Sequence, residues 1–279
     1  MVMKIGAHIS AAGGLWNAPA NAHAIGAETF QFFSRSPQGG TPAPITAEVV
    51  KKFRDACETY GYDEYVIHAP YFINFASEVP RIRHGSVAVL REELERGSLL
   101  GARYLMTHLG SAKDVGKKEA LKMVVTGIKK ILDGYRGSCQ FLIEISAGSG
   151  MVIGDSFEEI ADILNGVKNK KVDVCFDTQH AFASGYDLRT PKALNETLRA
   201  LDKTIGLERV VMSHCNDSKV ALGEKKDRHE HIGEGEIGLE AFRAIVNHPK
   251  LQHWLLMLET PWENQKKDLD LLKKLRVKK

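Results

Sequence analysis

The stretch that decides the fold reads Val172-Asp173-Val174-Cys175-Phe176-Asp177-Thr178-Gln179-His180-Ala181-Phe182. Its apolar first half is typical of a buried strand and leads directly into Asp177, and His180 follows on the turn that leaves the strand. Carboxylate and imidazole groups are common metal ligands in proteins. The stretch therefore predicts a buried strand that delivers two metal ligands to the surface, and other strands are expected to deliver more of them to the same place.

Short apolar runs like this one recur along the chain, each followed by a polar loop and a helix-like segment. They are rich in Val, Ile, Leu and Phe and are mostly continuous, as buried parallel strands are. The eight runs are residues 4–9, 29–33, 65–68, 104–108, 141–145, 172–176, 209–214 and 254–259.

Helix-like segments with recognisable end signals lie between these runs. A capping box or a Thr-Pro pair is expected at the beginning of a helix, and glycine is expected just after its end. The expected helices are residues 45–60 before Gly61, 86–100 before Gly101, one from the Ser156–Glu159 capping box to Asn165-Gly166, one beginning at Thr190-Pro191, 238–247 before Pro249, and 264–275.

Eight strands that alternate with helices, without a break in composition, favour a single-domain (β/α)8 TIM barrel over residues 1–279. In this fold the active site lies at the C-terminal ends of the strands. A doubly wound sheet is the alternative, but no glycine fingerprint follows the first run.

The composition is ordinary for a globular protein, with 43% hydrophobic and 26% charged residues. A formal net charge of +3 neither requires nor excludes a polyanionic partner. The four scattered cysteines form no C-x-x-C pair and are expected to be reduced and buried. The first residues do not resemble a signal peptide, and no apolar run is long enough for a membrane span, so a cytoplasmic protein without a membrane partner is expected.

The ends of the apolar runs provide a test of the barrel hypothesis. Six consecutive runs, the third to the eighth, each end at a His, Asp or Glu. These residues are His68, His108, Glu144, Asp177, His214 and Glu259, and the loops after the sixth and seventh runs add His180, Asp227 and His229.

Any one of these residues could be a structural group, but the set as a whole indicates a metal centre. Carboxylates crowded at one barrel mouth would repel one another and would be costly to bury without compensation. Nine ligands exceed the needs of one tetrahedral ion and suit two or three ions of zinc or manganese, with a carboxylate as a bridge. His8, at the end of the first run, is a candidate for supporting the ligands from behind, and His231 is a candidate for the rim or for a substrate contact.

Several longer motifs in this order resemble endonuclease IV, the family 2 apurinic/apyrimidinic (AP) endonucleases, over nearly the whole chain. The motifs are Ile5-Gly6-Ala7-His8-Ile9-Ser10-Ala11-Ala12-Gly13-Gly14, Ile67-His68-Ala69-Pro70-Tyr71-Phe72-Ile73-Asn74, Glu144-Ile145-Ser146-Ala147-Gly148, Cys175-Phe176-Asp177-Thr178-Gln179-His180-Ala181-Phe182-Ala183-Ser184-Gly185-Tyr186-Asp187, His214-Cys215-Asn216-Asp217-Ser218-Lys219, Asp227-Arg228-His229, Gly233-Glu234-Gly235 and Leu258-Glu259-Thr260-Pro261.

The resemblance implies a barrel with three Zn²⁺ ions, for which Mn²⁺ is a possible substitute. By motif, His68 and His108 hold the first zinc and Glu144 bridges it to the second. The remaining ligands are Asp177, His214 and Glu259 for the second zinc, and His180, Asp227 and His229 for the third.

The resemblance also implies the reaction. Such enzymes hydrolyse the phosphodiester 5′ to an abasic site in double-stranded DNA and leave a 3′-hydroxyl and a 5′-deoxyribose phosphate. A metal-activated hydroxide close to Glu259 would attack phosphorus, with Glu144 as the second catalytic carboxylate. A monomer is the family expectation.

The expected DNA contacts lie on the loops around the metal ligands. Tyr71 matches the family's tyrosine near the abasic nucleotide, and phosphate contacts would make binding sensitive to salt. The other candidates are Asn74, Lys225, Lys226, Arg228 and His231, together with Arg35 and Gln38 as substitutes for a missing wedge.

Two loops depart from the family pattern. The loop Ser34-Arg35-Ser36-Pro37-Gln38-Gly39-Gly40 lacks the Arg and Trp that some members wedge into the duplex. After His108 the chain reads Leu109-Gly110-Ser111-Ala112, where the family often has Pro and a second His.

Two other functions remain as alternatives. The first is a metal-dependent sugar isomerase or epimerase on the related xylose-isomerase-like barrel, which one or two ions would serve. The second is a module that binds DNA lesions without cutting them. The third ligand group, His180, Asp227 and His229, argues against the isomerase, and the complete ligand set argues against the binding module.

Overall fold

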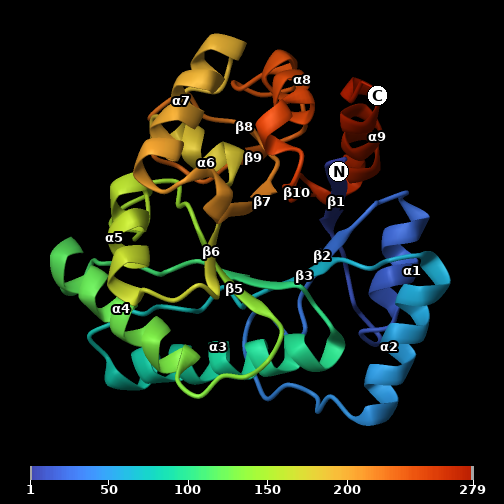
Figure 1. Ribbon diagram of the computed structural model, residues 1–279, viewed down its shortest axis with the longest axis vertical. Coiled ribbons are helices and arrows are strands. Elements are labelled where there is room, and N and C mark those ends of the chain that lie inside the picture. The colour runs from blue at the N-terminus through green and yellow to red at the C-terminus, as the bar shows by residue number, and fades with distance from the viewer. Residues whose placement is uncertain (1, 278–279) are drawn as a thin grey trace.

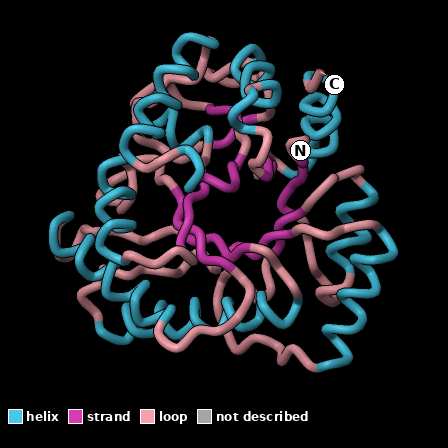
Figure 2. Tube along the Cα trace, viewed as in Figure 1, coloured by secondary structure: helices cyan, strands magenta, loops and turns pink. Residues whose placement is uncertain are grey.

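The barrel is closed by eight parallel strands. A computed structural model describes residues 2–277, and its strands form a ring enclosed by helices (Figures 1 and 2). The order around the ring is β1-β10-β7-β6-β5-β4-β3-β2. The barrel strands are β1 (Lys4–His8), β2 (Phe30–Phe32), β3 (Tyr65–His68), β4 (Tyr104–Thr107), β5 (Gln140–Glu144), β6 (Val172–Cys175), β7 (Val210–His214) and β10 (Leu255–Leu258).

The strands are held in register by neighbours on both sides, so that their C-terminal ends meet at one mouth. Ala7 pairs with Leu258 across the closure of the ring, and Glu144 pairs with Cys175 at the β5–β6 edge. A small cluster that includes Val66, Met106 and Met212 is buried among the barrel strands. The interior is therefore filled with side chains, and the chemistry is confined to the mouth.

Helices cover the outside of the barrel (Figure 1). Their bounds are α1 (Asn17–Ala24), α2 (Ala47–Tyr60), α3 (Pro80–Leu100), α4 (Lys117–Leu132), α5 (Phe157–Val167), α6 (Thr178–Ala183), α7 (Pro191–Thr204), α8 (Leu239–Asn247) and α9 (Gln265–Leu275). Three 3₁₀ turns, η1 (Leu207–Arg209), η2 (Pro249–Leu251) and η3 (Trp262–Asn264), and a two-stranded antiparallel pair, β8 (Asp217–Ser218) with β9 (His229–Glu230), complete the described elements.

The prediction of a (β/α)8 barrel with eight strands is confirmed, and so are the helix starts at Ser156 and Thr190. The side chain of Ser156 accepts a hydrogen bond from the Glu159 N–H, and Pro191 takes the first position of α7. The expected end of α5 at Asn165-Gly166 was wrong, because the helix continues to Val167 and Lys168 closes it in the left-handed conformation, with φ of 53°.

The segment after β6 is a helix rather than a turn. Residues Thr178–Ala183 form α6, which is buried along its whole length. α3 is also longer than expected, because it begins at Pro80 and not at residue 86.

Within residues 2–277 the four cysteines are buried and unpaired, as expected. No helix in the same part of the chain is long and apolar enough to cross a membrane.

Candidate metal centre

The predicted ligands meet at the mouth of the barrel. Six come from strand ends or from the first or second residue after them, namely His68, His108, Glu144, Asp177, His214 and Glu259. α6 carries His180, β9 carries His229, and Asp227 lies in the loop between β8 and β9. Eight of the nine fall into overlapping groups in which one donor atom from each residue lies within 4.8 Å of the others.

The first group contains His68, His108 and Glu144. Nδ1 of His108 lies 2.9 Å from Oε2 of Glu144. Nδ1 of His68 is occupied by the carbonyl oxygen of Ala69, 2.5 Å away, which leaves Nε2 to face the group. A backbone carbonyl on one imidazole nitrogen fixes the ring so that the other nitrogen can bind a metal.

The second group contains Glu144, Asp177, His214 and Glu259. Nδ1 of His214 lies 2.5 Å from Oε1 of Glu144 and 3.4 Å from Oε2 of Glu259. Glu144 belongs to this group and to the first, so one carboxylate faces both. This is the arrangement that a bridging ligand requires.

The third group contains Asp177, His180 and His229. Asp227 lies beside it, with one carboxylate oxygen 3.4 Å from Nε2 of His180 and the other 3.3 Å from Nε2 of His229. Asp177 therefore reaches both the second and the third group, whereas the sequence motifs assigned it to the second alone.

Cys175 is an additional neighbour, because its sulfur falls within 4.8 Å of Glu144 and His214 donor atoms. Burial raises the pKa of this thiol to about 11. A neutral thiol is a poor metal ligand, and Cys175 also belongs to the apolar cluster inside the barrel. We assign it to packing.

The chemistry of these residues fits metal ions. Nε2 of His180 and Nε2 of His229 are buried, and although Asp227 oxygens lie 3.4 and 3.3 Å from them, neither makes a hydrogen bond to any described residue. Buried polar atoms without partners are uncommon in proteins and are expected where an ion binds. Five imidazoles and four carboxylates, all at one mouth, form a donor set that suits zinc or manganese.

The charges of the cluster depend on one another. Burial opposes ionisation of Glu144, but His108 and His214 outweigh it and hold the Glu144 pKa well below its ordinary value. Burial likewise opposes protonation of His214, but neighbouring acidic groups, Glu259 and Glu144 among them, outweigh it and raise the His214 pKa. His68 is the exception, because burial lowers its pKa to about 3.

Two amide side chains that were not predicted from the sequence form hydrogen bonds with the ligands. Gln31 lies at the centre of β2, and its Nε2 donates to Oε1 of Glu259 at 2.8 Å. The amide oxygen of Gln31 lies 3.0 Å from Nε2 of His214. Nδ2 of Asn216 donates to Asp177 at 2.8 Å, and its Oδ1 accepts the Glu259 N–H at 2.8 Å. His8 completes this support, 3.5 Å from Glu259.

The candidate DNA contacts divide into two sets. Tyr71, Gln38, Lys225, Lys226 and Arg228 are exposed near the mouth. Tyr71 is 61% exposed, and its ring lies against those of Phe33 and His68.

The second set is engaged within the protein. The side chain of Arg35 is buried against Glu92, 2.9 Å away, and Nδ1 of His231 lies 2.7 Å from Oδ2 of Asp268. Oδ1 of Asn74 accepts the Ala76 N–H and so orders its own loop. Arg35 is therefore not presented to DNA as a substitute wedge.

Three cavities adjoin one another at the mouth. A central one of about 270 Å³ contains His68, His180 and Glu259. One of about 590 Å³ extends past Tyr71 and Asn74, and one of about 650 Å³ extends past His8 toward the loop after β2. Their shared lining residues make the mouth an elongated trough.

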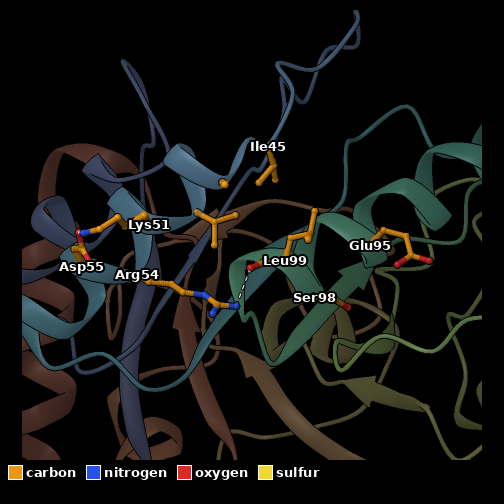
Figure 3. Close-up of a pocket in the computed structure, with 9 residues that line it drawn as sticks. Ile45, Lys51, Arg54, Asp55, Glu95, Ser98 and Leu99 are labelled. Atoms are coloured by element: carbon orange, nitrogen blue, oxygen red, sulfur yellow. Dashed lines mark hydrogen bonds and ion pairs between the residues drawn. The ribbon is translucent and has the colours of Figure 1, made fainter.

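A separate cavity of about 720 Å³ lies on the outer surface between α2 and α3 (Figure 3). It contains Ile45 and Leu99 and the ion pair of Lys51 with Asp55. Nη2 of Arg54 crosses it to the carbonyl oxygen of Leu99, 2.9 Å away. None of the predicted ligands lies here.

The comparison with known proteins first defines the class. A sequence model of the family described as "Xylose isomerase-like TIM barrel" matches residues 19–275. A solved D-tagatose 3-epimerase-like protein has a TM-score of 0.75 and 20% identity, over 98% of this chain and 97% of its own, which shows a shared fold alone.

Closer relatives define the branch of that family. "Probable endonuclease 4" of Halothermothrix orenii is 38% identical over 98% of this chain and 99% of its own length. The crystal structure of endonuclease IV from Thermus thermophilus has a TM-score of 0.87 and 34% identity, over 98% of each chain. The chain belongs to the endonuclease IV family of xylose isomerase-like TIM barrels, and its enzyme class is that of the nucleases.

Proposed function

We propose that the protein is a DNA repair enzyme that hydrolyses the phosphodiester 5′ to an abasic site in double-stranded DNA. The products would be a 3′-hydroxyl and a 5′-deoxyribose phosphate. The observation that carries the proposal is the convergence of the nine predicted ligands, eight of them in three overlapping donor groups, at the centre of the trough. A cytoplasmic monomer is part of the proposal.

The residues that would hold three zinc ions follow from the groups. His68, His108 and Glu144 form the first site. Glu144, Asp177, His214 and Glu259 form the second, and His180, His229 and Asp227 form the third, which Asp177 also approaches. Bound zinc would supply Lewis acidity, which lowers the pKa of a coordinated water and neutralises charge on the phosphate.

The protein's own contribution is to orient these groups. Gln31 holds one oxygen of Glu259, and Asn216 donates to a carboxylate oxygen of Asp177. The mutual geometry of Glu259 and Asp177 is thereby fixed before substrate binds, as catalysis by positioned charges requires. Glu144, fully buried between two imidazoles, stays ionised and can face two sites at once.

The trough suits an extended polyanion. Exposed Lys225, Lys226 and Arg228 flank the third donor group and can contact phosphates. Tyr71 lines both the central cavity and the adjoining cavity of about 590 Å³, and it can occupy the space that a missing base leaves. Contacts of this kind are expected to weaken as salt concentration rises.

The test uses two end-labelled duplexes that differ only in one tetrahydrofuran abasic analogue. The zinc-loaded protein is expected to cut the damaged strand once, on the 5′ side of the analogue, and the new end is expected to prime a polymerase because it carries a 3′-hydroxyl. The undamaged duplex should stay intact. A damaged duplex that stays intact would exclude the proposed reaction.

Metal analysis separates this proposal from the epimerase alternative. About three zinc ions per chain are expected for the nuclease, whereas one manganese or magnesium ion would favour a sugar isomerase or epimerase. Tight binding to abasic DNA without turnover, with all metals present, would favour a lesion-binding module.

A further inference from the structure

An exposed tryptophan stands at the edge of the donor groups. Trp262 begins η3, three residues after Glu259, and 61% of it is exposed to solvent. It borders both the central cavity and the cavity of about 650 Å³ that extends toward the loop after β2. A single exposed aromatic residue is ordinary on a protein surface, but one that lines a cavity beside a polar site offers a flat apolar face to a ligand.

The loop on the opposite side of this larger cavity is fixed. Nη1 of Arg35 lies 2.9 Å from Oε2 of Glu92, and its Nη2 donates to the carbonyl oxygen of Gly40 at 3.2 Å. Arg96 reaches the same loop from α3 and donates to the carbonyl oxygen of Ala43 at 2.9 Å. The loop therefore forms a wall. Phe33 and Trp262 both line the cavity, and Trp262 is the more exposed of the two and can contact a ligand from across the cavity.

The edge that carries Trp262 also has an unmet hydrogen bond. Oγ1 of Thr260 is buried, with 4% of the residue exposed, and has no partner among the described residues. Thr260 lines the central cavity together with Trp262. The hydroxyl oxygen itself is closed to solvent, so at this edge it is the exposed indole that can contact a nucleotide, which offers a flat base.

We infer that Trp262 positions the DNA by stacking on the base of a nucleotide next to the abasic residue, in the cavity between η3 and the loop after β2. The inference rests on the proposed function and deepens it. The cavity, at about 650 Å³, is within the range of pockets that hold small ligands. The indole contacts a base of any sequence, since every base has a π-face.

Kinetics provide the first part of the test. Trp262→Ala is expected to raise KM for the abasic duplex roughly 5- to 150-fold, the range for loss of one base–aromatic stack, with little change in kcat. Trp262→Phe should keep most of the affinity. Leu99→Ala is the matched control, because Leu99 is also an exposed apolar residue, at 51%, but lies on the outer surface (Figure 3).

Fluorescence separates stacking from a structural effect. In the zinc-loaded Glu259→Gln background, 2-aminopurine on either side of the abasic analogue is expected to be dimmer when bound to protein with Trp262 than with Trp262→Ala. The inference is overturned if KM is unchanged, or if KM rises but the fluorescence is the same in both complexes. If the wild-type protein does not cut abasic DNA, the proposed function fails instead.

Discussion

Oδ1 of Asp177 accepts a 2.8 Å hydrogen bond from the backbone N–H of His180 and so caps the helix that carries this histidine. The carboxylate that reaches the second and third donor groups therefore also sets the position of a ligand in the third. Because α6 is buried at every residue, the spacing between Asp177 and His180 is part of the packed structure.

Insertion of one alanine after Thr178 is expected to damage the centre more than loss of a single ligand would. One extra helical residue rotates the rest of α6 by about 100° and moves it by about 1.5 Å, so that His180 leaves its group. The variant should bind fewer than three zinc ions, measured by elemental analysis, and should lose incision.

The control for this variant is an alanine inserted after Gly134, in an exposed turn before β5, at the opposite end of the barrel. It should bind as much zinc as the wild type. Three zinc ions and full incision in the Thr178 insertion would refute the role assigned to this spacing.

Glu259→Gln is expected to keep DNA binding and to lose about 100-fold or more in kcat, a loss typical of removing a catalytic carboxylate. The amide is neutral and nearly isosteric, so the contact with Gln31 can be retained while the charge is lost. Single-turnover incision and binding to uncut abasic duplex measure the two effects. Glu119→Gln, in an exposed ion pair with Lys122, serves as the control. A wild-type rate for Glu259→Gln would remove Glu259 from the mechanism.

Gln31→Leu is expected to weaken zinc binding by about 10- to 100-fold, the usual cost of losing a group that orients metal ligands. Leucine fills a similar volume but cannot bond to Glu259 or His214. Competition with a chromophoric chelator measures the affinity. If zinc affinity in this variant equals that of the wild type, Gln31 only fills space.

The barrel could be predicted because its strands are buried on both faces, which makes them continuous apolar runs. Besides α6, two helices were missed, α1 and α4, and both begin without a side-chain cap. α1 is also short and has Pro19 inside it. The start of α3 at Pro80 is likewise preceded by Val79, an apolar residue that cannot cap a helix.

The metal ligands could be predicted because the C-terminal ends of barrel strands meet at one mouth. The roles of Gln31 and Asn216 could not, because they depend on contacts between distant residues. Gln31 and Glu259 are 228 positions apart, and a glutamine within an apolar run has no local feature that identifies its partner. Only the closure of β1 against β10 and β2 brings them together.

Arg96→Met is expected to destabilise the fold by about 3–5 kcal/mol, because it removes the nearest cation from the buried carboxylate of Glu93, which keeps only the Ser34 hydroxyl and Arg35, 3.7 Å away. Urea unfolding measures the change. Glu93→Gln in the same chain should recover part of the loss. Lys122→Met, which breaks an exposed pair with Glu119, is the control and should cost no more than about 1 kcal/mol.

The loss in Arg96→Met should depend on pH. Burial already raises the pKa of Glu93 in the folded protein, and removal of Arg96 should raise it further. Between the ordinary glutamate pKa and the raised pKa of Glu93, the folded variant holds a proton that the unfolded chain releases. The loss of stability relative to wild type should therefore grow as pH rises toward the pKa of Glu93 in the folded variant. It should shrink as pH falls toward the ordinary glutamate pKa. A difference that is constant between about pH 5 and pH 8 would contradict the assignment.

The most direct measurement is incision of a duplex with a single abasic analogue before chelation, after chelation and after zinc is restored. We predict one cut on the 5′ side of the analogue, its loss when a chelator removes the metal from His68, His180, His214 and their neighbours, and its return with zinc. A duplex that stays intact with fully zinc-loaded protein, or a cut that persists after all metal has been removed, would contradict the account.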